Sequence, residues 1–130
     1  MYLQHYEEKV IRESSILTNS YVATDIIWDE EIRLTERNQL VLYVDFTIWS
    51  LTSMELKVEF SPNEIDWYQE SSQLVDSWIA TIDLKEYVFD WTWKYRLAIP
   101  IKDKFLRVSA KGTWTVTSSL LKLSLITWVN

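Results

Sequence analysis

From residue 22 onward, large apolar side chains recur at every second position, which is the spacing of β-strands. The alternation is clearest from Met54 to Ser61, where four large apolar residues alternate with four polar ones. That pattern is typical of an antiparallel sheet with one buried face and one solvated face. Similar runs predict further strands at residues 40–48, 67–70, 78–84, 87–93, 95–101, 105–110, 113–117 and 120–129. About eight to ten short strands without a convincing helix predict an all-β fold, an antiparallel, jelly-roll-like β-sandwich.

The length of 130 residues predicts a single domain. Residues 1–20 differ from the rest, because charged residues there crowd around a few aliphatic ones in a weak amphipathic pattern. We interpret this stretch as an N-terminal arm or edge segment, with a short helix as a further reading, and residues 21–130 as the sandwich domain.

Composition excludes several kinds of chemistry. The chain has no cysteine and a single histidine, His5, so thiolate chemistry and a conventional Ser–His centre are not expected. A net charge of −6 argues against nucleic-acid binding, and no apolar run approaches the roughly 20 residues that span a bilayer. The start of the chain also lacks the pattern of a secretory signal. We therefore expect a protein that is not an enzyme, uses no cofactor and contacts neither nucleic acid nor a membrane.

Glycine is nearly absent, with Gly112 as the sole example. The tight Asn-Gly and Asp-Gly turns of short hairpins are missing, so we expect longer connections such as Ser61 to Asp66, where Asn63 tolerates a left-handed conformation. The resulting domain should be stiff, without the lids of many enzymes.

Acidic residues offer only weak candidate sites. Asp83 with Glu86, or Glu59 with Glu70, could approach each other in a sheet as a glycosidase pair would, but close pairs arise by chance among 19 acidic residues. An acidic cluster surrounds Trp28 without matching a calcium loop, so we interpret it as a solubilising edge and expect no metal. Its members are Asp25, Asp29, Glu30 and Glu31.

The most informative feature for function is a ladder of four aromatic residues, Phe89, Trp91, Trp93 and Tyr95. In one extended strand this spacing places all four on the same face. Such a face can pack against the second sheet, form a subunit interface, or stack sugar rings as a binding platform. We assign the ladder, with three further aromatic residues, as an interface or ligand platform, and the three are Trp49, Trp67 and Tyr68.

Several runs resemble a pattern found in small structural proteins of tailed bacteriophages. The runs are residues 33–47, ending in Tyr43-Val44-Asp45-Phe46-Thr47, then residues 55–61, 66–70 and 105–113. The chain departs from the pattern at Trp49 and at Pro62-Asn63-Glu64, where glycine is usual. The resemblance covers about residues 25–125 and implies a virion component, such as a capsid decoration, head-completion or tail protein, with no enzymatic residues.

These observations lead to two hypotheses. The first is a non-enzymatic bacteriophage virion protein, made in the host cytoplasm, that forms a symmetric homo-oligomer, expected to be a trimer, and binds capsid or tail proteins through aromatic strands. The second is a carbohydrate-binding module, free or displayed on a virion, that uses Trp91, Trp93 and Tyr95 as its glycan platform.

Overall fold

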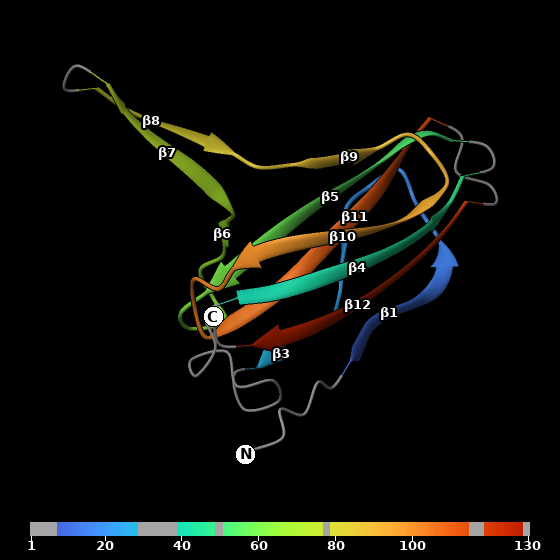
Figure 1. Ribbon diagram of the computed structural model, residues 1–130, viewed down its shortest axis with the longest axis horizontal. Coiled ribbons are helices and arrows are strands. Elements are labelled where there is room, and N and C mark those ends of the chain that lie inside the picture. Colours follow the sequence, from blue (N-terminus) through green and yellow to red (C-terminus); the bar gives the residue numbers. More distant parts are fainter. Residues whose placement is uncertain (1–7, 29–38, 49–50, 77–78, 115–118, 129–130) are drawn as a thin grey trace, which may run out of the picture.

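The computed structural model describes residues 8–28, 39–48, 51–76, 79–114 and 119–128. These residues form antiparallel strands in two packed sheets and one separate hairpin, so the predicted all-β sandwich is confirmed. No helix that could cross a membrane occurs in the described ranges. Figure 1 shows the two sheets one behind the other, with the hairpin extending away from them.

The four-stranded sheet, called sheet A, has the order β1-β12-β4-β10. Its strands are β1 (Lys9–Ile16), β12 (Leu120–Trp128), β4 (Gln39–Thr47) and β10 (Trp93–Pro100). The six-stranded sheet, called sheet B, has the order β2-β11-β5-β6, with β3 also paired to β11 and β9 to β5. Its strands are β2 (Val22–Ala23), β3 (Ile27–Trp28), β11 (Phe105–Trp114), β5 (Leu51–Ser61), β6 (Tyr68–Gln69) and β9 (Tyr87–Phe89).

The strand pairings follow the pattern of a long two-stranded ribbon that is rolled up. Strand β1 pairs with β12, β2 with β11, β4 with β10, and β5 with β9. These are the pairs of one long hairpin, and its successive segments lie alternately in sheets A and B. Pairings of β12 with β4 and of β11 with β5 then complete the sheets. This arrangement is a jelly roll, because the ribbon wraps around a single core.

The core lies between the sheets and follows the period-two pattern. Strands β4 and β5 contribute alternate side chains that are almost completely buried, which confirms the inward face predicted for residues 54–60. Strand β12 adds three inward leucines, and β11 adds Leu106, Val108 and Ala110. The buried residues of these four strands include Leu40, Leu42, Val44, Phe46, Met54, Leu56, Val58, Phe60, Leu106, Val108, Leu121, Leu123 and Leu125.

Two predicted strand boundaries are wrong. Residues 87–93 are not one strand: β9 ends at Phe89 in sheet B and β10 begins at Trp93 in sheet A, because the chain crosses between the sheets there. Residues 105–110 and 113–117 were predicted as two strands, but β11 runs without a break from Phe105 to Trp114. The backbone N–H of Gly112 donates to the Thr18 carbonyl at 2.7 Å, which ties this part of β11 to the segment after β1.

Two expectations about connections are also wrong. Strands β7 (Ser71–Asp76) and β8 (Ile79–Leu84) are joined by residues 77–78 alone, although the chain has no Asn-Gly or Asp-Gly turn. In the loop after β5 the left-handed residue is Glu64, with φ of 65°, and not Asn63. The Asn63 side chain holds that loop instead, since its Oδ1 accepts the backbone N–H groups of Ile65 and Asp66, each at 2.9 Å.

Candidate functional site

The four aromatic residues of the predicted ladder do not share one face of one strand. Phe89 is buried in the core at the end of β9, whereas Trp93 and Tyr95 lie on β10 of the other sheet, with Trp91 in the connection between them. The Phe89 and Tyr95 rings pack against each other with centroids 4.5 Å apart. The Tyr95 hydroxyl donates to the Trp91 carbonyl at 2.8 Å, so Tyr95 supports the connection and is not a free platform residue.

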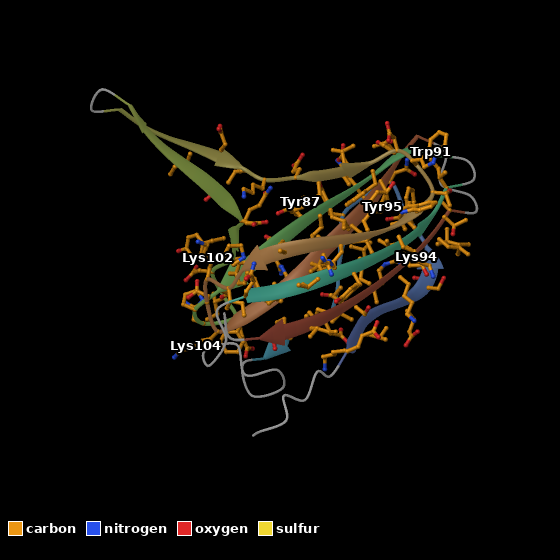
Figure 2. The ribbon with its side chains drawn as sticks, viewed as in Figure 1. Tyr87, Trp91, Lys94, Tyr95, Lys102 and Lys104 are labelled. Carbon is orange, nitrogen blue, oxygen red and sulfur yellow. The ribbon has the colours of Figure 1, made fainter. Side chains whose placement is uncertain are left out.

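The other two members, Trp91 and Trp93, are exposed and form what we call the aromatic corner. Their exposed fractions are 72% and 67%. A further bond holds this connection to sheet A, because the backbone N–H of Ile48 donates to the Thr92 hydroxyl at 2.9 Å. Figure 2 shows Trp91 at one end of the molecule, beside Tyr95. The corner therefore presents two large apolar rings from a backbone that hydrogen bonds hold on both sides.

The other aromatic residues singled out from the sequence lie elsewhere. Tyr68 is 62% exposed and pairs with Phe60, whereas Phe89 pairs with Met54 near the opposite end of β5. Six residues of strand separate those positions, or roughly 20 Å. Trp49 lies outside the described residues. The structure therefore does not bring this group together as one platform.

Trp67 is engaged within the outer face of sheet B. The Arg107 guanidinium lies over its ring at 4.2 Å from the centroid. The same guanidinium pairs with Glu59 through two contacts, from Nε to Oε1 at 3.2 Å and from Nη2 to Oε2 at 3.4 Å. We assign Trp67 a packing role, because its ring is already covered by a cation that a carboxylate holds in place.

Tyr21 lies on the same outer face beneath two lysines. Lys57 Nζ and Lys111 Nζ are 4.4 and 4.7 Å from its ring centroid, and Lys111 also pairs with Glu55 at 3.2 Å. The Tyr21 hydroxyl is buried and meets hydrogen-bond geometry with none of the described residues. Burial first, and then the negative charges of Glu86 and Glu55, raise the pKa of Tyr21 to about 12. The phenol is therefore neutral at physiological pH.

A second surface feature was not predicted from the sequence: a groove of about 470 Å³ on the outer face of sheet A, which we call the sheet A groove. Asp45 on β4 is paired with Lys94 on β10 and with Lys122 on β12, so these three residues form a row across it. Its walls include Tyr43, and its remaining lining residues are Glu8, Val44, Tyr95, Ser124 and Ile126. The sequence signal for the groove is the set of polar residues that alternate with the core positions of β4 and β12.

Some of the charged side chains around the groove have a hydrogen-bond or ion-pair partner among the described residues, and others do not. The Ser124 hydroxyl donates to Glu8 Oε1 at 2.6 Å, which engages that carboxylate. In contrast, Lys94, Lys122 and the nearby Arg96 form no ion pair with any carboxylate in the described ranges. Asp45 lies between Lys94 and Lys122, so the groove lining carries two lysines and two carboxylates, Glu8 and Asp45.

Strands β7 and β8 form a hairpin that we call the β7–β8 arm. Its register runs from Ser71 opposite Leu84 to Asp76 opposite Ile79, and the two strands pair only with each other among the described strands. Figure 1 shows the arm projecting from the sandwich beyond β6 and β9. In the rolled ribbon it lies at the fold-over point, between the paired strands β5 and β9.

Buried hydrogen bonds hold the base of the arm. Glu70 is buried, and its Oε1 accepts the Tyr87 hydroxyl at 2.7 Å while Lys85 Nζ lies 3.9 Å from its Oε2. The Lys85 backbone N–H donates to the Glu70 carbonyl at 2.8 Å. Burial, followed by the bond to Glu70, raises the pKa of Tyr87 above its ordinary value. Because both ends are fixed, the arm leaves the body in a defined direction.

The remaining candidates from the sequence, which are the acidic pair, a metal site and the single histidine, gain no support from the described residues. Glu59 and Glu70 are each engaged by their own partners, Arg107 and Tyr87, which argues against a free carboxylate pair. Among the described residues no group of three or more His, Cys, Asp or Glu could hold a metal ion. His5 and residues 29–31 of the acidic cluster lie outside the described ranges.

Comparison with known proteins finds no match for this chain. No protein-family model matches it, and neither a curated protein nor a solved structure does.

Proposed function

We propose that this chain is a non-enzymatic structural protein of a tailed-bacteriophage virion: a capsid decoration, head-completion or tail component. In this proposal it is made in the host cytoplasm, forms a closed homo-oligomer, with a trimer as the expected state, and binds capsid or tail proteins. The main support is the aromatic corner, where Trp91 and Trp93 are largely exposed on a hydrogen-bonded backbone. Exposed tryptophans on a rigid support are typical of the centre of protein interfaces.

The architecture is compatible with this proposal. Double-sheet jelly rolls form viral capsid domains as well as lectin domains. The fold is therefore compatible with both a virion protein and a carbohydrate-binding module and does not distinguish between them. The projecting β7–β8 arm adds support, because an isolated two-stranded ribbon is only marginally stable in water and gains from a partner.

The test is the double variant Trp91→Ala with Trp93→Ala, compared with the wild type by light scattering coupled to size exclusion over a tenfold or so dilution. We expect the wild type to be a closed oligomer and the variant to fall to the monomer mass of 15.6 kDa with unchanged β-sheet circular dichroism. Particle incorporation should be lost in parallel.

Tyr68→Ala is the matched control, because Tyr68 is also exposed but lies far from the corner along β5. The control should remain assembled. An assembled Trp91/Trp93 variant would refute the role of the corner as a subunit interface.

A carbohydrate-binding module is the second candidate, and the same exposed rings favour it. Tyr95 drops out of the platform because its hydroxyl is bound to the Trp91 carbonyl, which leaves Trp91 and Trp93 to stack on sugar rings. This function predicts a change in tryptophan fluorescence on titration with a polysaccharide, lost in the Trp91→Ala variant. Flat titrations across a glycan panel would exclude it.

A further inference from the structure

We propose that the sheet A groove binds a neutral oligosaccharide. In this site a sugar ring stacks on Tyr43, and its hydroxyl groups form hydrogen bonds with Asp45, Lys94 and Lys122. This binding role goes beyond the proposed virion function and does not depend on self-association. It is also distinct from the aromatic corner, because neither tryptophan of the corner lines the groove.

The strand register brings the binding groups together in two neighbouring rows. Asp45 lies directly opposite both Lys94 and Lys122, and Tyr43, two residues away on β4, lies opposite Ser124. Residues opposite each other in antiparallel strands have Cβ atoms roughly 4.5–5.5 Å apart, and the two rows are roughly 7 Å apart. The groove volume of about 470 Å³ falls in the range of about 300–1,000 Å³ that is usual for small-ligand sites. An aromatic ring, a carboxylate and two amines therefore lie within the span of a short oligosaccharide.

The charged groups of the central row are available to a ligand. Asp45 and Lys94 are exposed, and Lys122 is half-buried. The Asp45 carboxylate forms no hydrogen bond or ion pair with another described residue, and neither lysine pairs with a described carboxylate. The carboxylate can accept hydrogen bonds and the ammonium groups can donate them. Two neighbouring hydroxyl groups of a sugar can therefore bond to Asp45 and to a lysine at the same time, and such charge-assisted bonds are the strong ones.

The balance of charges in the groove favours a ligand without net charge. Its described lining carries two lysines, Lys94 and Lys122, and two carboxylates, Glu8 and Asp45. An anionic ligand is attracted by the lysines and repelled by the carboxylates, and the reverse holds for a cationic ligand. A sugar hydroxyl both donates and accepts hydrogen bonds, so a neutral sugar can use both kinds of group without a repulsive contact.

The groove also offers an apolar surface beside the polar row. Tyr43 and Ile126 line it and are half-buried, and Ile126 lies opposite Val41, which is buried although it alternates with the core positions of β4. Sugar rings have apolar faces that pack on aromatic side chains, and a rim of hydroxyl groups. An apolar surface next to a row of donors and acceptors is therefore complementary to such a ring.

The test is isothermal titration calorimetry of the full chain with neutral hexasaccharides built from glucose, mannose, galactose or N-acetylglucosamine. We expect at least one of them to bind with a dissociation constant of roughly 1 mM or tighter. The hexamers of galacturonic acid and of glucosamine are charged counterparts of two of these probes, and they should bind more weakly than the best neutral hexamer. Because the ligand is neutral, raising NaCl from about 0.05 to about 0.5 M should change the dissociation constant by less than about twofold.

Two groove variants locate the binding site. Asp45→Ala removes the central carboxylate and Tyr43→Ala removes the stacking ring, and each should raise the dissociation constant at least roughly tenfold. The matched controls remove the same groups at exposed positions outside sheet A: Asp83→Ala on β8 and Tyr68→Ala on β6 should bind like the wild type. Circular dichroism checks the fold of each variant, and Asp45→Ala, at an exposed position, decides the matter if Tyr43→Ala does not fold.

Three results would overturn the inference: no binding of any neutral hexamer, tighter binding of a charged hexamer that weakens with salt, or wild-type affinity in Asp45→Ala. The Trp91/Trp93 variant separates the groove from the aromatic corner, and it should bind the hexamer like the wild type. Loss of binding in that variant alone would place the glycan at the corner and refute the groove site. Self-association is read separately from the mass by light scattering, so failure of the proposed virion role and failure of the groove site give different results.

Discussion

Glu64 occupies the left-handed region of backbone space, with φ of 65°, in the loop between β5 and β6. Such a conformation costs a residue with a Cβ on the order of 1 kcal/mol that glycine does not lose. We expect Glu64→Gly to raise the free energy of unfolding by roughly 0.5–1 kcal/mol in urea titrations followed by tryptophan fluorescence. Ile65→Gly next to it, where φ is not positive, should lower that free energy instead. Equal losses in both variants would contradict the assignment.

Tyr21 predicts how stability depends on pH. Its pKa is about 12 in the folded protein, against about 10 in an unfolded chain. Ionisation of Tyr21 therefore has no effect on the unfolding free energy below about pH 10 and lowers it between about pH 10 and 12, because only the unfolded chain ionises readily in that range. We expect Tyr21→Phe to flatten the fall in unfolding free energy over this range, as measured by urea titration at several pH values.

The same variant has a second expected result at pH 7. It removes a buried hydroxyl that lacks a described hydrogen-bond partner, so the unfolding free energy should be unchanged or higher by up to about 1 kcal/mol. Tyr68→Phe, at an exposed ring, is the control and should leave the stability at pH 7 unchanged. A pH profile identical to that of the wild type in Tyr21→Phe would refute the role of Tyr21.

At the scale of elements, the β7–β8 arm should be separable from the sandwich. Its ends are adjacent, since Ser71 pairs with Leu84 and the Lys85 N–H donates to the Glu70 carbonyl. We expect replacement of residues 71–84 by Asn-Gly, which suits a two-residue hairpin turn, to change the unfolding free energy by less than about 2 kcal/mol. Circular dichroism and urea titration measure this, and loss of the folded state would mean that the arm belongs to the core.

At the scale of the whole molecule, the rolled ribbon makes the last strand indispensable. Strand β12 lies between β1 and β4 in sheet A and buries Leu121, Leu123 and Leu125. Each of these leucines is expected to contribute about 2–5 kcal/mol, so their joint loss exceeds the usual stability of a domain. Removal of residues 119–130 should therefore abolish cooperative thermal unfolding, although the arm excision, which removes a longer segment, should not. A cooperative transition in the truncated chain would contradict this topology.

Much of the fold was predictable because it depends on local alternation. The inward positions of β5 and β12 follow from the spacing of large apolar residues, and a strand buried on one face has little freedom in register. The site was less predictable. The spacing of Phe89, Trp91, Trp93 and Tyr95 was read correctly, but spacing cannot reveal that the chain changes sheets between Phe89 and Trp93. The polar alternation within β4 and β12 was visible, but it does not reveal that side chains from strands distant in sequence line one groove.

By itself, the sequence determined that the chain is an all-β sandwich and which side chains enter its core, because apolar alternation acts over a few neighbouring residues. Only the tertiary structure decided that Phe89 and Tyr95 are supports while Trp91 and Trp93 are exposed. It also decided that the β7–β8 arm pairs with no other described strand and that Lys94 and Lys122 lie on either side of Asp45. The physical reason is that exposure and proximity depend on which strands pair, and in a jelly roll those pairs join opposite ends of the chain.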